Sequence, residues 1–141
     1  MEYIDIVFNG ISIKSIDTLV KNDLKISEEI IIRSHFYTEE AGDFEYYDKI
    51  NLVEYFSSQR TSNMLMSSLK LNKVYNNVMI VITSDENEIY VTLNIESEQI
   101  KSRDAEELQH CLYSIFEKYD LKSIYAGDEN SKEENAFWVI K

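Results

Sequence analysis

The chain has 141 residues, of which 44% are hydrophobic, and its 14 basic and 26 acidic residues give a formal net charge of −12. The hydrophobic content excludes wholesale disorder, and the length suits one domain, residues 1–141, with one core. The acidity argues against nucleic acid as a direct ligand, because that needs clustered Lys and Arg, and favours a basic protein as partner.

The chain begins with an apolar segment interrupted by an Asn-Gly pair. Asn9-Gly10 suits the two positive-φ positions of a type I′ turn. The sequence therefore predicts a hairpin of residues 3–8 and 11–14, with Phe8 across from Ile11. Ile6 would then lie across from Ile13, and these four residues would share one face with Ile4.

Residues 16–22 predict a short helix, and residues 28–37 contain a β-branched run that predicts a strand. Ala41-Gly42-Asp43 is typical of a turn, so residues 44–48 are expected to return antiparallel. Tyrosines and acids gather around this second hairpin: Tyr37, Glu39, Glu40, Asp43, Glu45, Tyr46, Tyr47 and Asp48.

Residues 52–70 carry helical spacing of apolar residues, with Asn51 as the expected N-cap. The polar run at residues 60–63 competes for backbone hydrogen bonds, so this stretch predicts one kinked helix or two short helices.

The clearest pattern in the chain lies at residues 78–95. Residues 89–95 alternate apolar and polar side chains, which is the signature of a strand with one buried face. Residues 78–82 are apolar on both sides, and the polar run 84–88 suits a turn. This pattern predicts a central hairpin on which the helices pack.

The C-terminal third predicts a helix and two strands. Residues 103–120 form an apolar stripe at helical spacing, and Asp104 with Glu107 resembles a capping box. Strands are expected at residues 122–125 and 136–140, joined by an acidic loop. The sum is an α+β fold with a largely antiparallel sheet of about eight strands, made of three hairpins plus C-terminal strands, and two or three helices.

No motif in the sequence carries chemistry. The three glycines stand alone, which excludes a phosphate-binding loop, and no set of residues predicts a metal or another cofactor. His110 and Cys111 are neighbours on a helix and point about 100° apart, so they do not form a nucleophile–base pair. His35, with Arg33 and Tyr37 on the same strand face, is a candidate for acid–base work.

The acidic, tyrosine-rich hairpin at residues 37–48 is the best candidate binding site. Tyrosine rings serve as anchors in protein interfaces, while surrounding carboxylates steer and pair with Lys and Arg. The loop after residue 126, with Asp128 and Glu129, is the second candidate. The alternative for both is an ordinary acidic surface.

The compartment is inferred from absences in the sequence. One cysteine, Cys111, allows no internal disulfide, and the first residues lack the basic and apolar regions of a signal peptide. No apolar stretch reaches the roughly 20 residues needed to span a bilayer. We therefore expect a cytoplasmic protein without a membrane partner.

The charge, the Tyr and Asn content, the strand-rich start and the Tyr46-Tyr47-Asp48 stretch before a helix together resemble the small immunity proteins of bacterial contact-dependent growth inhibition and polymorphic toxin systems. The resemblance implies a protein without enzymatic activity that occludes a cognate basic toxin, often a nuclease. Two alternatives stay open: a chaperone for a secreted effector, and a small enzyme that uses His35 or a carboxylate pair.

Overall fold

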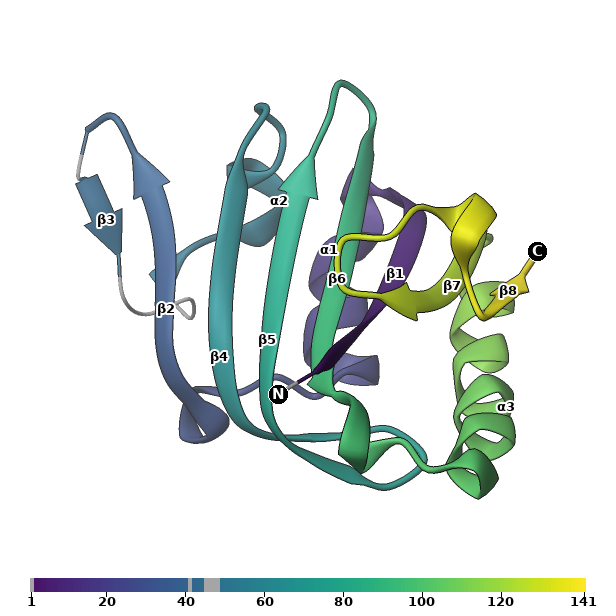
Figure 1. Cartoon of the computed structure of the whole chain (residues 1–141). Helices are drawn as coiled ribbons and strands as arrows, with labels where there is room; N and C mark the ends of the chain where they lie inside the picture. The colour runs from purple at the N-terminus through teal and green to yellow at the C-terminus, as the bar shows by residue number, and fades with distance from the viewer. Residues whose placement is uncertain (1, 41, 45–48) are drawn as a thin grey trace.

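The protein is described by a computed structural model that covers residues 2–40, 42–44 (43 and 44 by backbone alone) and 49–141. In these residues eight strands form one sheet in the order β3-β2-β4-β5-β6-β1-β7-β8, and every pair of neighbours is antiparallel (Figure 1). The strands are β1 (Tyr3–Ser12), β2 (Ile31–Thr38), β3 (Gly42–Phe44), β4 (Thr61–Lys70), β5 (Val74–Ser84), β6 (Glu88–Glu96), β7 (Ser123–Asp128) and β8 (Trp138–Ile140). The predicted α+β class and the antiparallel sheet are confirmed.

The first strand corrects the predicted N-terminal hairpin. β1 runs without a turn through Asn9-Gly10, and its pairing with β6 shifts between Phe8 and Ile11. Gly10 has a φ of +87°, but Asn9 does not share a positive φ, as a type I′ turn would require. The glycine therefore serves a β-bulge, and the strand continues because β6 and β7 pair with it on both sides.

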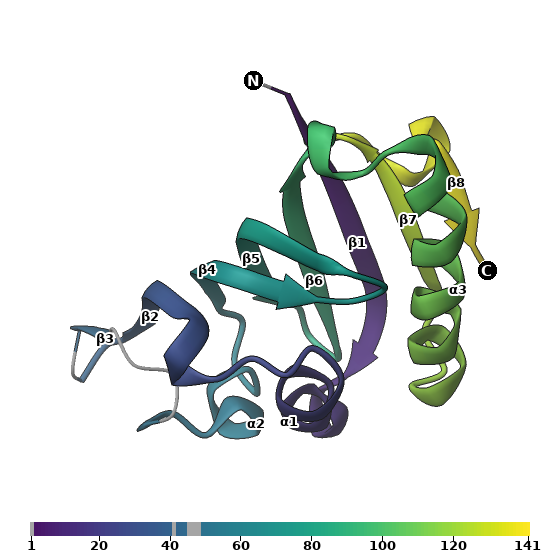
Figure 2. The same cartoon turned by 90° about the horizontal axis from the view of Figure 1, so that it is seen from below.

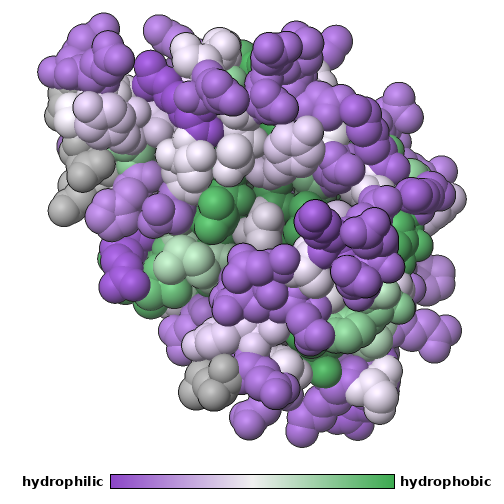
Figure 3. Space-filling view, turned by 45° about the horizontal axis from the view of Figure 1, so that its top comes forward, coloured by the Kyte–Doolittle hydropathy of each residue, from purple (hydrophilic) through white to green (hydrophobic). Residues whose placement is uncertain are grey.

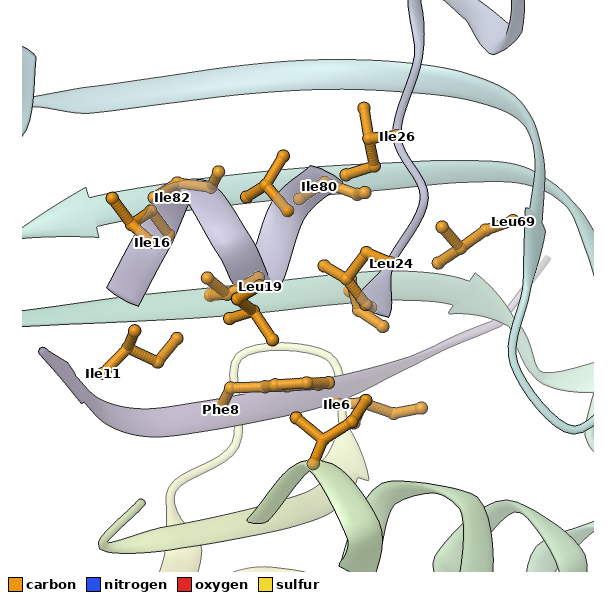
Figure 4. Packing of buried hydrophobic residues seen from close by; sticks show 14 of the residues in the cluster. Ile6, Phe8, Ile11, Ile16, Leu19, Leu24, Ile26, Leu69, Ile80 and Ile82 are labelled. Atoms are coloured by element: carbon orange, nitrogen blue, oxygen red, sulfur yellow. The ribbon is translucent and has the colours of Figure 1, made fainter. Parts of the chain in front are cut away.

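A short helical segment follows β1 and covers the sheet. It consists of α1 (Ile16–Thr18) and a π-helical turn (Leu19–Asp23), in agreement with the predicted helix. Its side chain Leu19 lies over Phe8 of β1, and Ile16 lies beside Ile82 of β5 (Figure 4). Burial of this apolar face against the sheet holds the segment in place, because so short a helix is not stable alone.

The second hairpin is present where the structure describes it, but its return strand β3 begins at Gly42, inside the predicted turn. A 3-10 turn (Glu28–Ile30) leads into β2, and β3 pairs with its end, with Thr38 opposite Gly42. The rest of the expected return strand, residues 45–48, lies outside the described residues.

The predicted helix over residues 52–70 is wrong in its second half. The helix α2 (Leu52–Tyr55) is a single turn, capped by Asn51 as expected, whose Oδ1 accepts a hydrogen bond from the Glu54 amide at 3.1 Å. Residues 61–70 form β4 instead, in which Met64 and Met66 are fully buried. The apolar residues of this stretch recur both at a spacing of two, which fits a strand, and at spacings of three or four, which fit a helix. Pairing with β2 and β5 selects the strand.

The predicted central hairpin is confirmed. Residues 85–87 join β5 to β6, and the Asp85 amide donates to the Glu88 carbonyl at 2.8 Å. Ile89, Val91 and Leu93 are fully buried, as their alternation predicts. β4, β5 and β6 thus form a three-stranded meander, where a helix and a hairpin were expected.

The predicted long helix is confirmed as α3 (Ser102–Lys118), which is preceded by a 3-10 turn (Ser97–Gln99). Asp104, the third residue of α3, caps the N-terminus of the helix: its carboxylate accepts a hydrogen bond from the Lys101 amide at 3.0 Å. The stripe residues Leu108 and Leu112 are buried against the sheet. Among the described residues, no helix has the length and apolar character that crossing a membrane requires.

The end of the chain forms the second edge of the sheet. β7 is longer than predicted and takes in residues 126–128, and a 3-10 turn (Glu133–Asn135) leads to β8. β8 is an edge strand that pairs only with β7, so Val139 is 40% exposed and the strand is not enclosed as expected.

In the described part of the chain, the helices cover one face of the sheet and leave the other uncovered. α1 and α2 lie behind the middle strands, and α3 lies against the β1–β7–β8 end of the same face (Figures 1 and 2). Leu108 of α3 approaches Ile4 and Ala126, whose side chains lie on the same side as the core residues Ile6 and Phe8. The remaining side chains of the strands form an open face without a helix.

Candidate functional site

The open face is defined by the strand register. Residues directly paired across neighbouring strands point to the same side. Arg33 and His35 of β2 lie beside β4, and Val7 of β1 lies between Thr92 of β6 and Tyr125 of β7. The paired side chains of this face include Arg33, His35, Asn63, Leu65, Met79, Val81, Tyr90, Thr92, Asn94, Asp5, Val7 and Tyr125.

A hollow of about 610 Å³ lies in this face over β5, β6, β1 and β7. Its apolar lining includes Val7, Met79 and Val81, which are half-buried although no helix covers them. In the space-filling view, apolar surface lies in the middle of the molecule and hydrophilic residues surround it (Figure 3). An apolar centre within a polar rim is the composition of a protein interface.

One wall of the hollow is a hydrogen-bonded group of polar side chains. The Asn94 Nδ2 donates to Asp5 Oδ1 and to Glu129 Oε2, each at 2.8 Å. Asp5 Oδ2 accepts a further hydrogen bond from the Asn130 amide, also at 2.8 Å, and only 7% of Asp5 is exposed. These bonds fold the loop after β7 over the open face (Figure 1).

Two tyrosines complete the lining of the hollow. Burial, followed by the negative charges of Glu88 and Asp85, raises the pKa of Tyr90. Burial, followed by the charges of Glu133 and Asp5, raises the pKa of Tyr125. Both rings therefore stay neutral at physiological pH and lie in a negative environment.

The β2 end of the open face has a different character. Arg33, His35 and Tyr37 lie on the same side of β2, as predicted, and all three side chains are exposed. The Tyr37 carbonyl accepts a hydrogen bond from Arg60 Nη1 at 3.3 Å. An exposed histidine on a strand, outside the hollow, is not the deep acid–base site that the enzyme alternative requires.

The sequence-predicted site residues form two groups at opposite ends of the strand order. Tyr37 is 57% exposed, and Glu39 and Glu40 are exposed at the turn after β2. Asp128 and Glu129 are exposed at the end of β7, which four strands separate from β2 in the sheet. Asp43 has its backbone in β3, and its side chain is outside the described part of the chain, as are Glu45, Tyr46, Tyr47 and Asp48.

Exposed acids also occur far from both groups. Glu106, Glu107 and Glu117 lie on α3, and Glu28 and Glu29 lie before β2. Charge alone therefore does not single out a surface, and the shape of the open face is the better guide.

Sequence reasoning missed the hollow itself. Tyr90 and Asn94 were recognised as the polar side of a strand, and Asp5 alternates with the apolar residues of β1 in the same way. Alternation marks which side chains share a face, and it does not tell which face the helices leave open.

The described residues offer little for catalysis. They contain no group of three His, Cys, Asp or Glu side chains that could hold a metal ion. Burial raises the pKa of the Cys111 thiol, which makes this half-buried cysteine a poor nucleophile. His110 is exposed on α3.

Comparison with known proteins gives two matches. A family model described as the PABL017 Cdi1I immunity protein matches residues 2–139. A chain of the crystal structure of the toxic C-terminal tip of CdiA from Pseudomonas aeruginosa in complex with immune protein is similar in fold, with a TM-score of 0.73 and 16% identity over 98% of this chain and 94% of that chain. No curated protein sequence matches the chain.

Proposed function

The chain belongs to the Cdi1I immunity protein family, and from that premise we propose that it binds the toxic C-terminal tip of a CdiA protein through its open sheet face. An immunity protein is an inhibitor, so membership agrees with the prediction that the chain is not an enzyme. It also favours this function over the chaperone alternative. The chain that is similar in fold to this one comes from a crystal structure of a CdiA toxin tip in complex with immune protein. This supports a toxin tip as the partner.

The observation that carries the proposal is an open sheet face with a hollow at its centre. A sheet packed on helices normally turns a polar face to solvent. Here the uncovered face has half-buried Val7, Met79 and Val81 at its middle and tyrosines at its sides. Such a face exposes apolar area that a partner can bury, and its rigid strands need no ordering on binding.

The proposed mechanism is occlusion of a basic toxin surface, most simply that of a nuclease. Carboxylates at the two ends of the open face, Glu39 and Glu40 on one side and Asp128 and Glu129 on the other, would take Lys and Arg side chains that otherwise hold phosphates. Tyr37 is the exposed aromatic anchor on the same side as Glu39 and Glu40. The residues outside the described part, Asp43 (side chain), Glu45, Tyr46, Tyr47 and Asp48, belong to the same proposed surface. A cytoplasmic location is part of the proposal, because that is where a nuclease toxin meets its substrate.

The proposal is tested with the toxic C-terminal tip of the cognate CdiA protein. Co-expression of the wild-type chain should restore growth of cells that produce the toxin tip, and the two purified proteins should bind each other. Thr92→Arg puts a long, charged side chain in the middle of the open face and should weaken binding by at least about 30-fold.

The matched control is Ser114→Arg, which makes a similar change at an exposed position of α3. It should leave binding and growth protection unchanged. A wild-type chain that neither binds nor protects contradicts the proposed function. Equal losses in both variants, or a loss only in the α3 variant, contradict the open face as the interface.

A further inference from the structure

The hollow in the open face has two carboxylates and, among the described residues that line it, no Lys, Arg or His. We infer that it receives one Lys or Arg side chain of the toxin partner, with Asp5 and Glu129 as the anionic groups and Tyr90 and Tyr125 as the aromatic walls. This inference rests on the proposed function and names the chemistry of one contact within it.

The geometry of the carboxylates favours a cation between them. Asp5 Oδ1 and Glu129 Oε2 each lie 2.8 Å from the same Asn94 nitrogen, so the two oxygens are no farther apart than twice that distance. Two like charges at such a separation repel each other, and one bound cation attracts both. A carboxylate has about four acceptor positions, so both groups keep free lone pairs for an N–H donor.

The carboxylates are already held in place before a partner arrives. Asp5 is on β1, between two paired strands, and it also accepts a hydrogen bond from the Asn130 amide at 2.8 Å. Glu129 is fixed from the other side by Asn94. A preorganised pair costs little ordering on binding, which distinguishes it from the freely exposed acids of α3.

The remaining lining suits the rest of a long cationic side chain. Val7, Met79 and Val81 offer an apolar surface for the methylene stem. The faces of Tyr90 and Tyr125 carry negative quadrupole charge, which attracts an ammonium or guanidinium group. An uncharged apolar side chain in the same place would desolvate both carboxylates without compensation, so it is the poorer occupant.

The test is the affinity of variants for the cognate CdiA toxin tip, measured by titration calorimetry at low and at high salt. Glu129→Gln keeps the size and an acceptor oxygen but removes one charge, and Asp5→Asn does the same for the second carboxylate. Each should weaken binding about 30-fold or more and reduce its dependence on salt. Thermal unfolding of both variants checks that the fold is intact.

The matched control is Glu134→Gln, an exposed acid in the same loop that does not line the hollow. It removes the same charge and should change the affinity no more than about twofold. If Glu129→Gln and Asp5→Asn bind the toxin tip as the control does, the inference is overturned while the proposed function stands. If Met79→Ala weakens binding and Glu129→Gln does not, the occupant is apolar and the inference is also overturned. Failure of the wild-type chain to bind any toxin tip would instead contradict the proposed function.

Discussion

Replacement of Gly10 by alanine tests the bulge that takes the place of the predicted hairpin. Gly10 has a φ of +87°, a backbone conformation that costs an L-residue about 1–2 kcal/mol. An added Cβ would lie 2.8 Å from Lys122 Cγ and 3.2 Å from its Cβ, so the Lys122 side chain, which pairs with Glu88, must move. The reduced entropy of the unfolded chain offsets about 0.4–1 kcal/mol of this loss.

We expect Gly10→Ala to lower the free energy of unfolding by about 1–2 kcal/mol and the Tm by roughly 3–8 °C, measured by circular dichroism. Gly42→Ala is the control, because Gly42 has a similar φ of +71° and a Cβ there meets no atom within 4 Å. It should lose less stability than Gly10→Ala. A Gly10→Ala variant as stable as the wild type would refute the reasoning, and equal losses in the two variants would show that the Lys122 contact contributes nothing.

Three further predictions concern the packing and titration of the fold. Leu112→Ala removes a fully buried side chain of α3 and should cost about 2–5 kcal/mol in urea unfolding, whereas Glu106→Ala on its exposed side should change the free energy by less than about 0.5 kcal/mol; equal effects would contradict the packing. The hydrogen bond from Lys73, followed by that from the Lys101 amide, lowers the pKa of Asp104 below its unfolded value, so its stabilising effect is present above about pH 4 and is lost as the pH falls below it. Asp104→Asn should therefore lower the Tm at pH 7 and much less at pH 3, and a loss of the same size at both values would refute this. Burial raises the pKa of Tyr75 to about 12, so stability should fall as the pH rises from about 10 to 12; a Tyr absorbance titration in the folded protein that shows every tyrosine ionised by pH 10.5 would contradict it.

Elements with one consistent local pattern could be predicted from the sequence. The alternation at residues 89–95 and the helical stripe of residues 103–120 each fit one period, and burial of one face explains both. The errors occur where two local structures fit equally well. Asn9-Gly10 suits a type I′ turn and a bulge, and residues 61–70 suit a helix and a strand; pairing with distant strands decides both.

The candidate site depends on contacts that no local pattern contains. Asp5 meets Asn94 and the loop at Glu129 and Asn130, which are 89 or more residues away in the chain. The acidic and aromatic residues were visible in the sequence, but charge is spread over both faces, so composition could not show which surface is hollow. The position of the helices decides that, and it is a property of the whole fold.

The claim that the toxin binds the open face is tested most directly by the methyl signals of three methionines. In the free protein, Met79 lines the hollow, whereas Met64 and Met66 are fully buried on the helix side of the sheet. We predict that addition of the CdiA toxin tip to protein labelled at the methionine methyl carbons shifts the Met79 signal and leaves those of Met64 and Met66 in place. A saturated complex in which the Met79 signal does not move would contradict the account.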